Sequence, residues 1–194
     1  MKKTVVFDLD STLVYCFRID TNSSFEAYEK LKRHPNYSKI KDKVFKCEVV
    51  DCLDNEKKGV GKLRTFVVFL RPHVKELIQS ISKNYNIDIW SAGQMRYVWM
   101  LNYYIFSSHC NVRNIYSFSD CIITENSVSK NLKSKNYDME NTTIIDDRED
   151  VCEENKGSSF NISPFEPNVY NPEKFFEDYF KDNALIDIKN FLEK

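Results

Sequence analysis

The chain has 194 residues, enough for one domain with a sizeable core and a modest insertion. Its 28 Lys and Arg residues nearly balance its 29 Asp and Glu residues, and the net charge of −1 argues against a general nucleic-acid-binding protein, which is usually strongly basic. Six cysteines are scattered without a CxxC pair, which argues against a zinc ribbon or a redox dithiol, so reduced structural thiols are expected.

The amino-terminal sequence begins with Met1, two lysines and a short apolar run, without the long apolar stretch and small-residue cleavage site of a signal peptide. No apolar run approaches the length of a transmembrane helix. We therefore expect an intracellular protein, in the nucleus or the cytoplasm, that does not associate with membranes. We also expect a monomer.

The first predicted strand spans residues 3–7 and leads directly into a polar sequence with two carboxylates, Asp8-Leu9-Asp10-Ser11-Thr12. Burying charge at a strand end costs free energy unless the charge is paired or binds a metal ion. The same residue types also cap helices and form Asx turns. Taken alone, the pattern does not distinguish a cation site from a strand-to-helix turn.

The stretch up to about Phe17 is expected to loop over this site, and residues 18–70 form a predicted insertion. Within the insertion, residues 24–34 show the apolar spacing of a helix, with Ser23 or Ser24 as its cap. Pro35 follows and stops that helix.

A β-hairpin is predicted in the second part of the insertion. Residues 44–50 and 63–70 have the composition of strands, and the polar, glycine-bearing segment 54–61 predicts the turn between them. The segment 30–46 is rich in lysine, which fits either a solvated surface or an electrostatic attraction for a phosphate-rich partner.

The core fold is expected to resume after the hairpin. Pro72 at a first helical position fits a helix over residues 73–83, and residues 86–90 predict the next strand. That strand ends at a hydroxyl and a permissive backbone that could meet a phosphate, in the sequence Ser91-Ala92-Gly93. The helix predicted over 94–106 is rich in aromatic residues; these favour packing over a stacking platform, and Tyr97 alone lies close enough to Ser91 to be suspected of a role.

Further strands are predicted over residues 120–124 and 142–146, joined by a polar connection that includes 130–135. The second of these strands ends in another acidic pair, Asp146-Asp147. Beyond it, residues 160–162 predict an edge strand, and two amphipathic helices are predicted over 172–181 and 183–193.

Alternation of strands and helices predicts an α/β fold. Parallel strands of such folds bind ligands in the crevice beyond their carboxyl ends, so the two acidic pairs are expected to meet there. This coincidence favours a cation site with reactive chemistry over simple turn formation.

Four motifs in order resemble those of the haloacid-dehalogenase-like phosphatases, in the branch that acts on the carboxy-terminal domain of RNA polymerase II. The motifs are Asp8-Leu9-Asp10-Ser11-Thr12, Trp90-Ser91-Ala92-Gly93, Lys130 nine residues after Cys121, and Asp146-Asp147 sixteen residues after Lys130, with Arg71-Pro72-His73 before a helix as an additional mark.

The resemblance implies a Rossmann-like haloacid-dehalogenase fold, with a central, mostly parallel sheet flanked by helices and a helix plus β-hairpin insertion after the first motif. It implies one catalytic domain over residues 1–194. The implied activity is Mg²⁺-dependent hydrolysis of phosphomonoesters through an aspartyl-phosphate, as in a phosphoserine or phosphothreonine protein phosphatase. The implied partner is a phosphorylated protein or peptide, for example the carboxy-terminal domain of RNA polymerase II; a nucleic-acid partner is not expected.

Each predicted site residue has a role in that chemistry. Asp8 is the expected nucleophile and Asp10 the general acid and base, while Lys130 and the Ser91 hydroxyl stabilise the phosphoryl group. The expected metal ligands are Asp8, the Asp10 carbonyl and Asp147, with Asp146 a ligand or a partner of the ligands. The expected substrate-binding residues are Thr12, Ser91, Ala92, Tyr97 and Lys130.

Two departures from the branch bear on the substrate. The arginine that small members carry just before the cysteine strand is missing, although Arg113 lies a few residues upstream. After the last acidic pair the chain continues with Arg148 in place of the usual Ser-Pro. A small-molecule phosphatase of the same superfamily and a non-catalytic scaffold with the same fold therefore stay open as alternatives.

Overall fold

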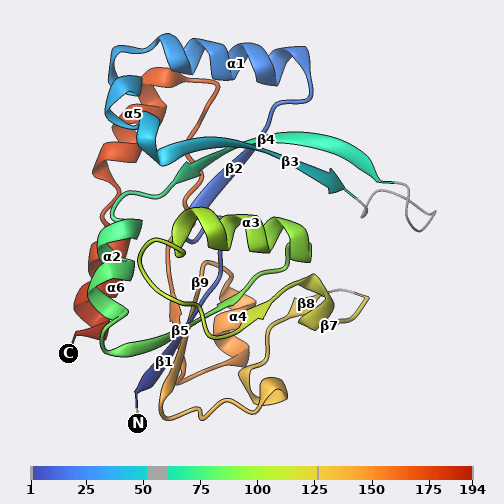
Figure 1. Cartoon of the computed structure of the whole chain (residues 1–194), viewed down its shortest axis with the longest axis vertical. Helices are drawn as coiled ribbons and strands as arrows, with labels where there is room; N and C mark the ends of the chain where they lie inside the picture. Colours follow the sequence, from blue (N-terminus) through green and yellow to red (C-terminus); the bar gives the residue numbers. More distant parts are fainter. Residues whose placement is uncertain (1, 52–60, 126, 194) are drawn as a thin grey trace. The chain divides into compact units, whose positions relative to one another are not determined.

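The computed structural model describes residues 2–51, 61–125 and 127–193 (Figure 1). Its contacts divide the chain into two compact units. The first contains Met1–Leu13, His73–Phe165 and Asn183–Lys194, and the second contains Val14–Pro72 and Glu166–Asp182. The second unit thus combines the predicted insertion with a segment from near the carboxyl end, a combination that the sequence pattern did not indicate.

A five-stranded parallel sheet with strand order β10-β9-β1-β5-β6 forms the centre of the first unit. Its strands are β1 (Lys3–Phe7), β5 (Tyr85–Trp90), β6 (Ile115–Tyr116), β9 (Thr142–Asp146) and β10 (Ser159–Asn161). The three central strands carry runs of buried β-branched and aromatic residues, as expected where helices cover a parallel sheet. The prediction of an α/β fold with a central parallel sheet is confirmed.

Four α-helices accompany this sheet in the described part of the first unit: α2 (Val74–Ile81), α3 (Met95–Ile105), α4 (Glu149–Glu154) and α6 (Ala184–Leu192). Helix α2 packs against α6, α3 packs against β6, and α4 packs against β9 and β10. The apolar face of α2, which includes Leu77 and Ile78, is buried as its spacing predicts. None of the helices in the described ranges is long and apolar enough to cross a membrane.

The second unit contains an antiparallel sheet of order β2-β4-β3, formed by β2 (Val14–Arg18), β4 (Lys62–Leu70) and β3 (Val44–Asp51). Helices α1 (Asn22–Arg33) and α5 (Pro172–Lys181) belong to the same unit, with short 3₁₀ turns at Pro35–Lys39 and Lys41–Lys43. Phe69 of β4 packs its ring against Tyr28 of α1 and Phe175 of α5. These aromatic contacts form the core of the unit.

Arg71, the first residue of the Arg-Pro-His sequence, is buried inside the second unit. Its guanidinium pairs with both carboxylate oxygens of Asp182, with Nε at 3.1 Å from each and Nη2 at 2.9 Å from one. The Tyr179 hydroxyl donates to the Leu70 carbonyl at 2.9 Å. These bonds join the end of β4 to the end of α5. Arg71 of the Arg-Pro-His sequence therefore has a structural role here, because it connects these two elements.

Several expectations for the insertion need correction. The stretch before Phe17 is a loop only up to residue 13: Val14 to Phe17 belong to β2, whose residues pair one by one with β4. The cap of α1 is Thr21, because the helix begins at Asn22, two residues earlier than predicted; the Thr21 hydroxyl accepts from the Ser24 N–H and the Ser24 hydroxyl accepts from the Thr21 N–H. The two hairpin strands are confirmed, while most of the predicted turn lies outside the described residues.

Other corrections concern the first unit. Pro72 precedes α2 by two residues and His73 is its N-cap, in the left-handed region with φ of 67°. The strand predicted over 120–124 is only two residues long, β7 (Ile122–Ile123). It pairs antiparallel with β8 (Val128–Ser129) in a two-stranded sheet separate from the main sheet. The fifth strand of the main sheet is the two-residue β6, which, like the short helix α4, was not predicted.

Candidate active site

The register of the central sheet aligns the ends of three strands. Phe7 of β1 lies beside Ile145 of β9 and Ile89 of β5. Asp8 therefore emerges next to Asp146, and its N–H continues the ladder by donating to the Ile145 carbonyl at 3.0 Å. Parallel strands whose last paired residues coincide deliver their next side chains to one edge, as the sequence predicted.

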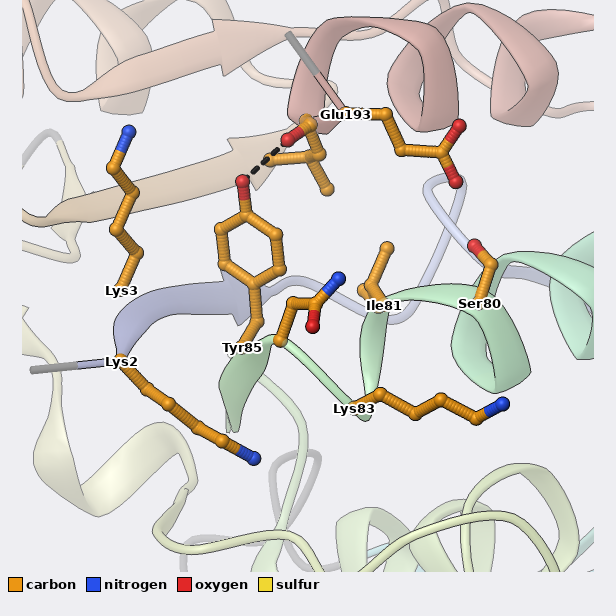
Figure 2. Close-up of a pocket in the computed structure, with 9 residues that line it drawn as sticks. Lys2, Lys3, Ser80, Ile81, Lys83, Tyr85 and Glu193 are labelled. Carbon is orange, nitrogen blue, oxygen red and sulfur yellow. Dashed lines mark hydrogen bonds between the residues drawn. The ribbon is translucent and has the colours of Figure 1, made fainter.

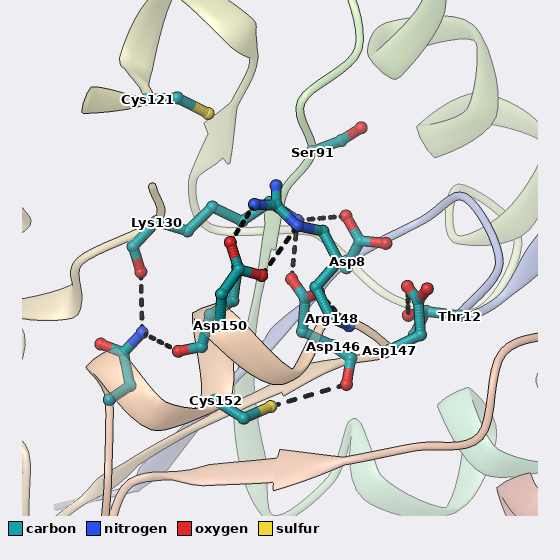
Figure 3. A network of polar contacts seen from close by, with 12 residues as sticks. Asp8, Thr12, Ser91, Cys121, Lys130, Asp146, Asp147, Arg148, Asp150 and Cys152 are labelled. Atoms are coloured by element: carbon teal, nitrogen blue, oxygen red, sulfur yellow. Dashed lines mark hydrogen bonds and ion pairs between the residues drawn. The ribbon is translucent and has the colours of Figure 1, made fainter. Parts of the chain in front are cut away.

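Three carboxylates meet at this edge, from Asp8, Asp146 and Asp147, with oxygens that all lie within 4.8 Å of one another. Asp8 is only 5% exposed and Asp146 is fully buried. Lys130, whose residue is 1% exposed, donates to Asp8 and to Oδ2 of Asp146, the latter at 2.7 Å (Figure 3). Like charges this close repel one another strongly in a buried site, and one ammonium group offsets only part of that repulsion.

The protonation of the cluster reflects this imbalance. Burial raises the pKa of Asp8 to about 8, against the lowering effect of Lys130, and the charge of Asp146 raises it further. Burial and Asp146 likewise raise the pKa of Asp147. Burial alone would lower the pKa of Lys130, but the carboxylates of Asp8 and Asp146 raise it above its ordinary value. The lysine therefore stays charged, and the carboxylates are held in a site that favours an additional cation.

Neighbouring groups fix the orientation of the cluster. The Thr12 hydroxyl donates to Oδ1 of Asp147 at 3.1 Å, and the Arg148 N–H donates to Oδ1 of Asp146 at 3.0 Å. Tyr97 donates its phenolic hydrogen to Asp10. Ser11, between Asp10 and Thr12, has a φ of 58°, so the turn after β1 passes through the left-handed region to bring these side chains into place.

Asn155, a buried residue after α4, fixes the backbone on either side of Asn131 and so the position of Lys130. The Asn155 amide donates to the Lys130 carbonyl at 2.9 Å, and its oxygen accepts from the N–H of Leu132 at 2.9 Å. This pair of hydrogen bonds from the Asn155 side chain was not predicted. A polar residue near a helix end gives no sequence signal that its side chain is buried, so only the structure identifies it.

Ser91 lies at the end of β5, followed by Ala92 and Gly93. The Ser91 Oγ accepts from the Gly93 N–H at 3.0 Å. A Cβ added at Gly93 would lie 2.7 Å from Cδ1 of Tyr97 and 3.2 Å from the Ser91 Oγ, so glycine allows the close approach of this loop to the first turn of α3. Glycine at position 93 therefore leaves room for the Tyr97 ring and the Ser91 hydroxyl on either side of it.

A cavity of about 340 Å³ opens at this edge of the sheet. Its lining residues are Asp8, Asp10, Ser11, Ser91, Ala92, Gly93, Lys130, Asp147 and Arg148. Of the predicted site residues, Thr12, Tyr97 and Asp146 lie outside this lining and contact it through the bonds described above. Arg148 was not predicted as a site residue, although its place directly after the acidic pair was a signal. Arg113 is paired elsewhere, with Asp88 at 2.7 Å.

The donor set fits a divalent cation of the Mg²⁺ type. Carboxylate oxygens are hard ligands, and they converge without histidine or cysteine ligands among the described residues of the cluster. The half-buried Asp147 lines the cavity, where a cation could also keep water ligands. Burial, and after it the charge of Asp146, raise the pKa values of Asp8 and Asp147, so their ionised forms are favoured by an additional cation.

A larger cavity, of about 570 Å³, lies away from these residues. Lys2, Lys3 and Lys83 line it together with Tyr85, whose hydroxyl donates to the Leu192 carbonyl (Figure 2). Figure 2 shows the lysine ammonium groups pointing away from one another. These ammonium groups do not converge on a common point. The cavity therefore lacks the convergent charged side chains that characterise the strand-end cluster.

Two viral proteins that share one name are similar in sequence to this chain. The chain is 23% identical over 184 residues to the "Putative CTD phosphatase-like protein 355R" of Invertebrate iridescent virus 6, covering 84% of this chain and 86% of that protein. It is 22% identical to the protein of the same name in Invertebrate iridescent virus 3, covering 99% and 96% of the two chains.

Solved structures give the same fold. A fission yeast RNA polymerase II CTD phosphatase Fcp1 variant bound to beryllium fluoride superposes with a TM-score of 0.65 at 20% identity, over 98% of this chain and 49% of that one. Another Fcp1 structure gives 0.64 at 19% identity, over 100% and 54%. The chain thus spans about half the length of these Fcp1 chains. A putative β-phosphoglucomutase from Thermotoga maritima gives 0.50 at 14% identity, over 98% of each chain.

The haloacid-dehalogenase-like fold predicted from the motifs is therefore confirmed, and fold and relatives together support a phosphatase activity. The model of the family described as "NLI interacting factor-like phosphatase" matches residues 3–194. The strand-end carboxylates, the fold and this match over nearly the whole sequence lead to one conclusion: the chain belongs to the NLI interacting factor-like phosphatase family.

Proposed function

We propose that this protein is a Mg²⁺-dependent phosphoserine or phosphothreonine protein phosphatase that works through an aspartyl-phosphate on Asp8. The observation that carries the proposal is Lys130, which bridges Asp8 and Asp146 in a buried cluster of carboxylates. A structural ion pair needs one carboxylate for one ammonium group. An excess of buried carboxylates beside a cavity instead fits phosphoryl transfer to an aspartate with the help of a cation.

Asp8 is the proposed nucleophile. Its carboxylate oxygen attacks phosphorus while the bond to the leaving oxygen breaks, which gives an aspartyl-phosphate. Lys130 orients Asp8 and favours its ionised form against the effect of burial, and its charge also offsets the charge of the approaching phosphoryl group. Ser91, which also lines the cavity, would hydrogen-bond a phosphoryl oxygen, and the small side chain of Ala92 lines the cavity next to it.

Asp10 is the proposed general acid and base. In the first step its carboxylic acid protonates the leaving oxygen, and in the second its carboxylate takes a proton from the water that hydrolyses the aspartyl-phosphate. The hydrogen bond from Tyr97 supports this role because it fixes the Asp10 side chain. This geometry favours orientation of Asp10, rather than direct substrate contact, as the function of Tyr97.

Asp8, the Asp10 carbonyl and Asp147 are the proposed holders of Mg²⁺. When bound there, the ion supplies charge that reduces repulsion between the nucleophile and the phosphate. Both oxygens of Asp146 already accept hydrogen bonds, from Lys130 and the Arg148 N–H, which favours Asp147 as the ligand and Asp146 as its support. Thr12, proposed from the sequence to contact substrate, is better placed to orient Asp147.

An extended phosphoprotein segment, such as the carboxy-terminal domain of RNA polymerase II, is the proposed substrate. The names of the viral relatives and of the Fcp1 structures support this choice. A metabolite phosphatase or a scaffold with a silent site would share the fold, so substrate class is decided by experiment.

The test is phosphate release from p-nitrophenyl phosphate, with Mg²⁺ or with EDTA, by the wild type and by Asp8→Asn. We expect activity that needs both Mg²⁺ and Asp8. Lys133→Gln, which removes an exposed cation outside the cavity, serves as the matched control and keeps full activity. Lack of turnover in a folded, Mg²⁺-supplied wild type, or equal turnover by Asp8→Asn, would contradict the proposal.

A substrate panel then separates the classes. Phosphoserine and phosphothreonine peptides are compared with sugar phosphates and nucleotides at equal concentration, using kcat/KM as the readout. We expect peptides to be preferred. A preference for one of the small molecules would make this a metabolite phosphatase and leave the aspartyl-phosphate mechanism in place.

A further inference from the structure

Arg148 lines the candidate active site but has no role in the mechanism above. It is the N-cap of α4 and directly follows Asp147. Figure 3 shows its side chain extending from the end of β9 toward Lys130 and Asp8, with which it shares the cavity lining. Asp146 and Asp8 both act electrostatically on the guanidinium. The side chain is 33% exposed, so a ligand can reach it.

Asp150 holds the Arg148 guanidinium along one edge. Nε donates to Oδ1 at 3.1 Å and Nη2 donates to Oδ2 at 2.5 Å, a pair of parallel bonds that fixes the plane of the group. The Asp150 carboxylate lies outside the cavity lining. Within the described ranges Nη1 takes part in no hydrogen bond with the protein, so Nη1 and the second hydrogen of Nη2 form an edge that can donate to a ligand.

Charge balance shows what that edge can bind. Lys130 is the other cation of the lining, and its ammonium is already shared between two carboxylates. A divalent cation and Lys130 together would balance the three clustered carboxylates and leave little charge for a dianionic phosphate. Arg148 is the cation of the lining whose own partner is an exposed surface carboxylate.

We propose that Arg148 binds the phosphoryl group of the substrate through its free edge, and that Asp150 is the positioning residue that orients it. This inference rests on the proposed phosphatase function. Arginine suits the task because its planar fork can donate two parallel hydrogen bonds to phosphoryl oxygens while the opposite edge stays fixed. The interaction adds a second cation to the phosphate site, beside Lys130.

The competing explanation is that Arg148 and Asp150 form only a surface ion pair at the start of α4. Such a pair stabilises the helix slightly and has no effect on ligand affinity. The two explanations differ in phosphate binding, which can be measured whether or not the protein turns over substrate.

The test measures two properties of the Arg148 variants Arg148→Gln, Arg148→Lys and Arg148→Ala and of the Asp150 variants Asp150→Asn and Asp150→Glu. The first is the affinity for inorganic phosphate in the presence of Mg²⁺, by calorimetry. The second is KM and kcat with p-nitrophenyl phosphate. Glu149→Gln is the matched control, since it neutralises the neighbouring exposed carboxylate in the same helical turn.

We expect Arg148→Gln to weaken phosphate binding and lower kcat/KM by about 10- to 100-fold, the effect of one charge-assisted hydrogen-bonded contact. Arg148→Lys should recover part of the loss because it keeps the charge but lacks the fork. Asp150→Asn should raise KM by a smaller factor, because the arginine remains but loses the carboxylate that orients it. Asp150→Glu should return KM toward the wild-type value, because it keeps a carboxylate beside the guanidinium. Glu149→Gln should behave as the wild type.

Unchanged phosphate affinity and unchanged KM in Arg148→Gln would overturn the proposal and leave the phosphatase function intact. A wild type without turnover would instead contradict the proposed function. In that case the phosphate titration still decides the role of Arg148, because it needs no chemistry. Free guanidinium that restores phosphate binding to Arg148→Ala would support direct contact, since a purely structural pair would not respond in this way.

Discussion

Two buried carboxylate sites in the first unit differ in how their charge is satisfied. Asp88, in the middle of β5, is fully buried and accepts hydrogen bonds from Arg113, from the backbone and side chain of Asn114, and from Tyr137, at 2.5 to 3.1 Å. At the strand ends, three carboxylates cluster, and one lysine pairs with two of them, Asp8 and Asp146. Burial alone therefore does not mark a functional acid.

The number of donors around each carboxylate separates the two sites. Asp88 has a donor for nearly every lone pair, so it needs nothing from outside the protein and ties β5 to the segment that follows α3. The cluster around Asp8 has too little positive charge to be stable when fully ionised. A site of the first kind contributes to folding, and we propose that one of the second kind is completed by a ligand.

The largest expected effect is on activity, in Asp8→Asn. If Asp8 is the nucleophile, as proposed, its removal should lower kcat by at least about 10³-fold. The free energy of unfolding of the metal-free protein should stay the same or rise, because the change removes a poorly compensated charge. Phosphate-release assays together with urea unfolding test this pair of outcomes. A strong loss of stability would make Asp8 a structural residue like Asp88.

Asp88→Asn should show the reverse behaviour. It removes the charge partner of Arg113 and places an amide among hydrogen-bond donors, so the free energy of unfolding should fall by about 3 kcal/mol. Urea unfolding measures the change, and Asp138→Asn, an exposed carboxylate with local partners, is the control that should change little. Activity per folded molecule should be retained. If Asp88→Asn lost activity without losing stability, Asp88 would be a functional residue, and the contrast between the Asp88 site and the Asp8 cluster would be wrong.

The dependence of stability on pH sharpens the contrast. The pKa of Asp8 is about 8 in the folded protein and near its ordinary value of 3.8 when unfolded, so between these values the folded state holds the extra proton. The free energy of unfolding of metal-free protein should therefore fall as pH rises from about 4 to 8. Subtracting the profile of Asp8→Asn isolates this contribution; identical profiles would show that Asp8 is not perturbed.

Thr12→Val should have the smallest effect. The substitution keeps the shape of a buried side chain but removes the hydrogen bond to Asp147. Since Asp147 is the proposed Mg²⁺ ligand, we expect the Mg²⁺ concentration needed for half-maximal activity to rise by about 10-fold, the usual effect of losing a hydrogen-bond partner of a metal ligand. A change in KM for substrate with an unchanged Mg²⁺ requirement would instead favour direct contact between Thr12 and substrate.

Sequence patterns predicted the parts of the fold that depend on long apolar runs. Strands β1, β5 and β9 and helices α2, α3, α5 and α6 have such runs, and their ends differ from prediction by a few residues at most. The two-residue β6 and the six-residue α4 are too short to produce a periodic signal, and β2 becomes a strand only through its pairing with β4. Tertiary contacts decide such elements.

The site shows the same limit. Asp8 and Asp146 could be placed together because each follows an apolar strand, and Lys130 could be assigned only through its motif spacing. Arg148 and Asn155 could not be assigned, since their positions depend on how α4 packs beside β9. Polar residues gain such roles from three-dimensional packing, which leaves no periodic pattern in the sequence.

The central claim is that a divalent cation completes the strand-end cluster. The most direct test is the midpoint of thermal unfolding at pH 8.5, with and without Mg²⁺, for the wild type and Asp147→Asn. At a Mg²⁺ concentration tenfold above its dissociation constant, we expect the wild type to gain about 3 to 6 °C and the variant to gain much less. Equal gains in both proteins, or none in the wild type, would contradict the claim.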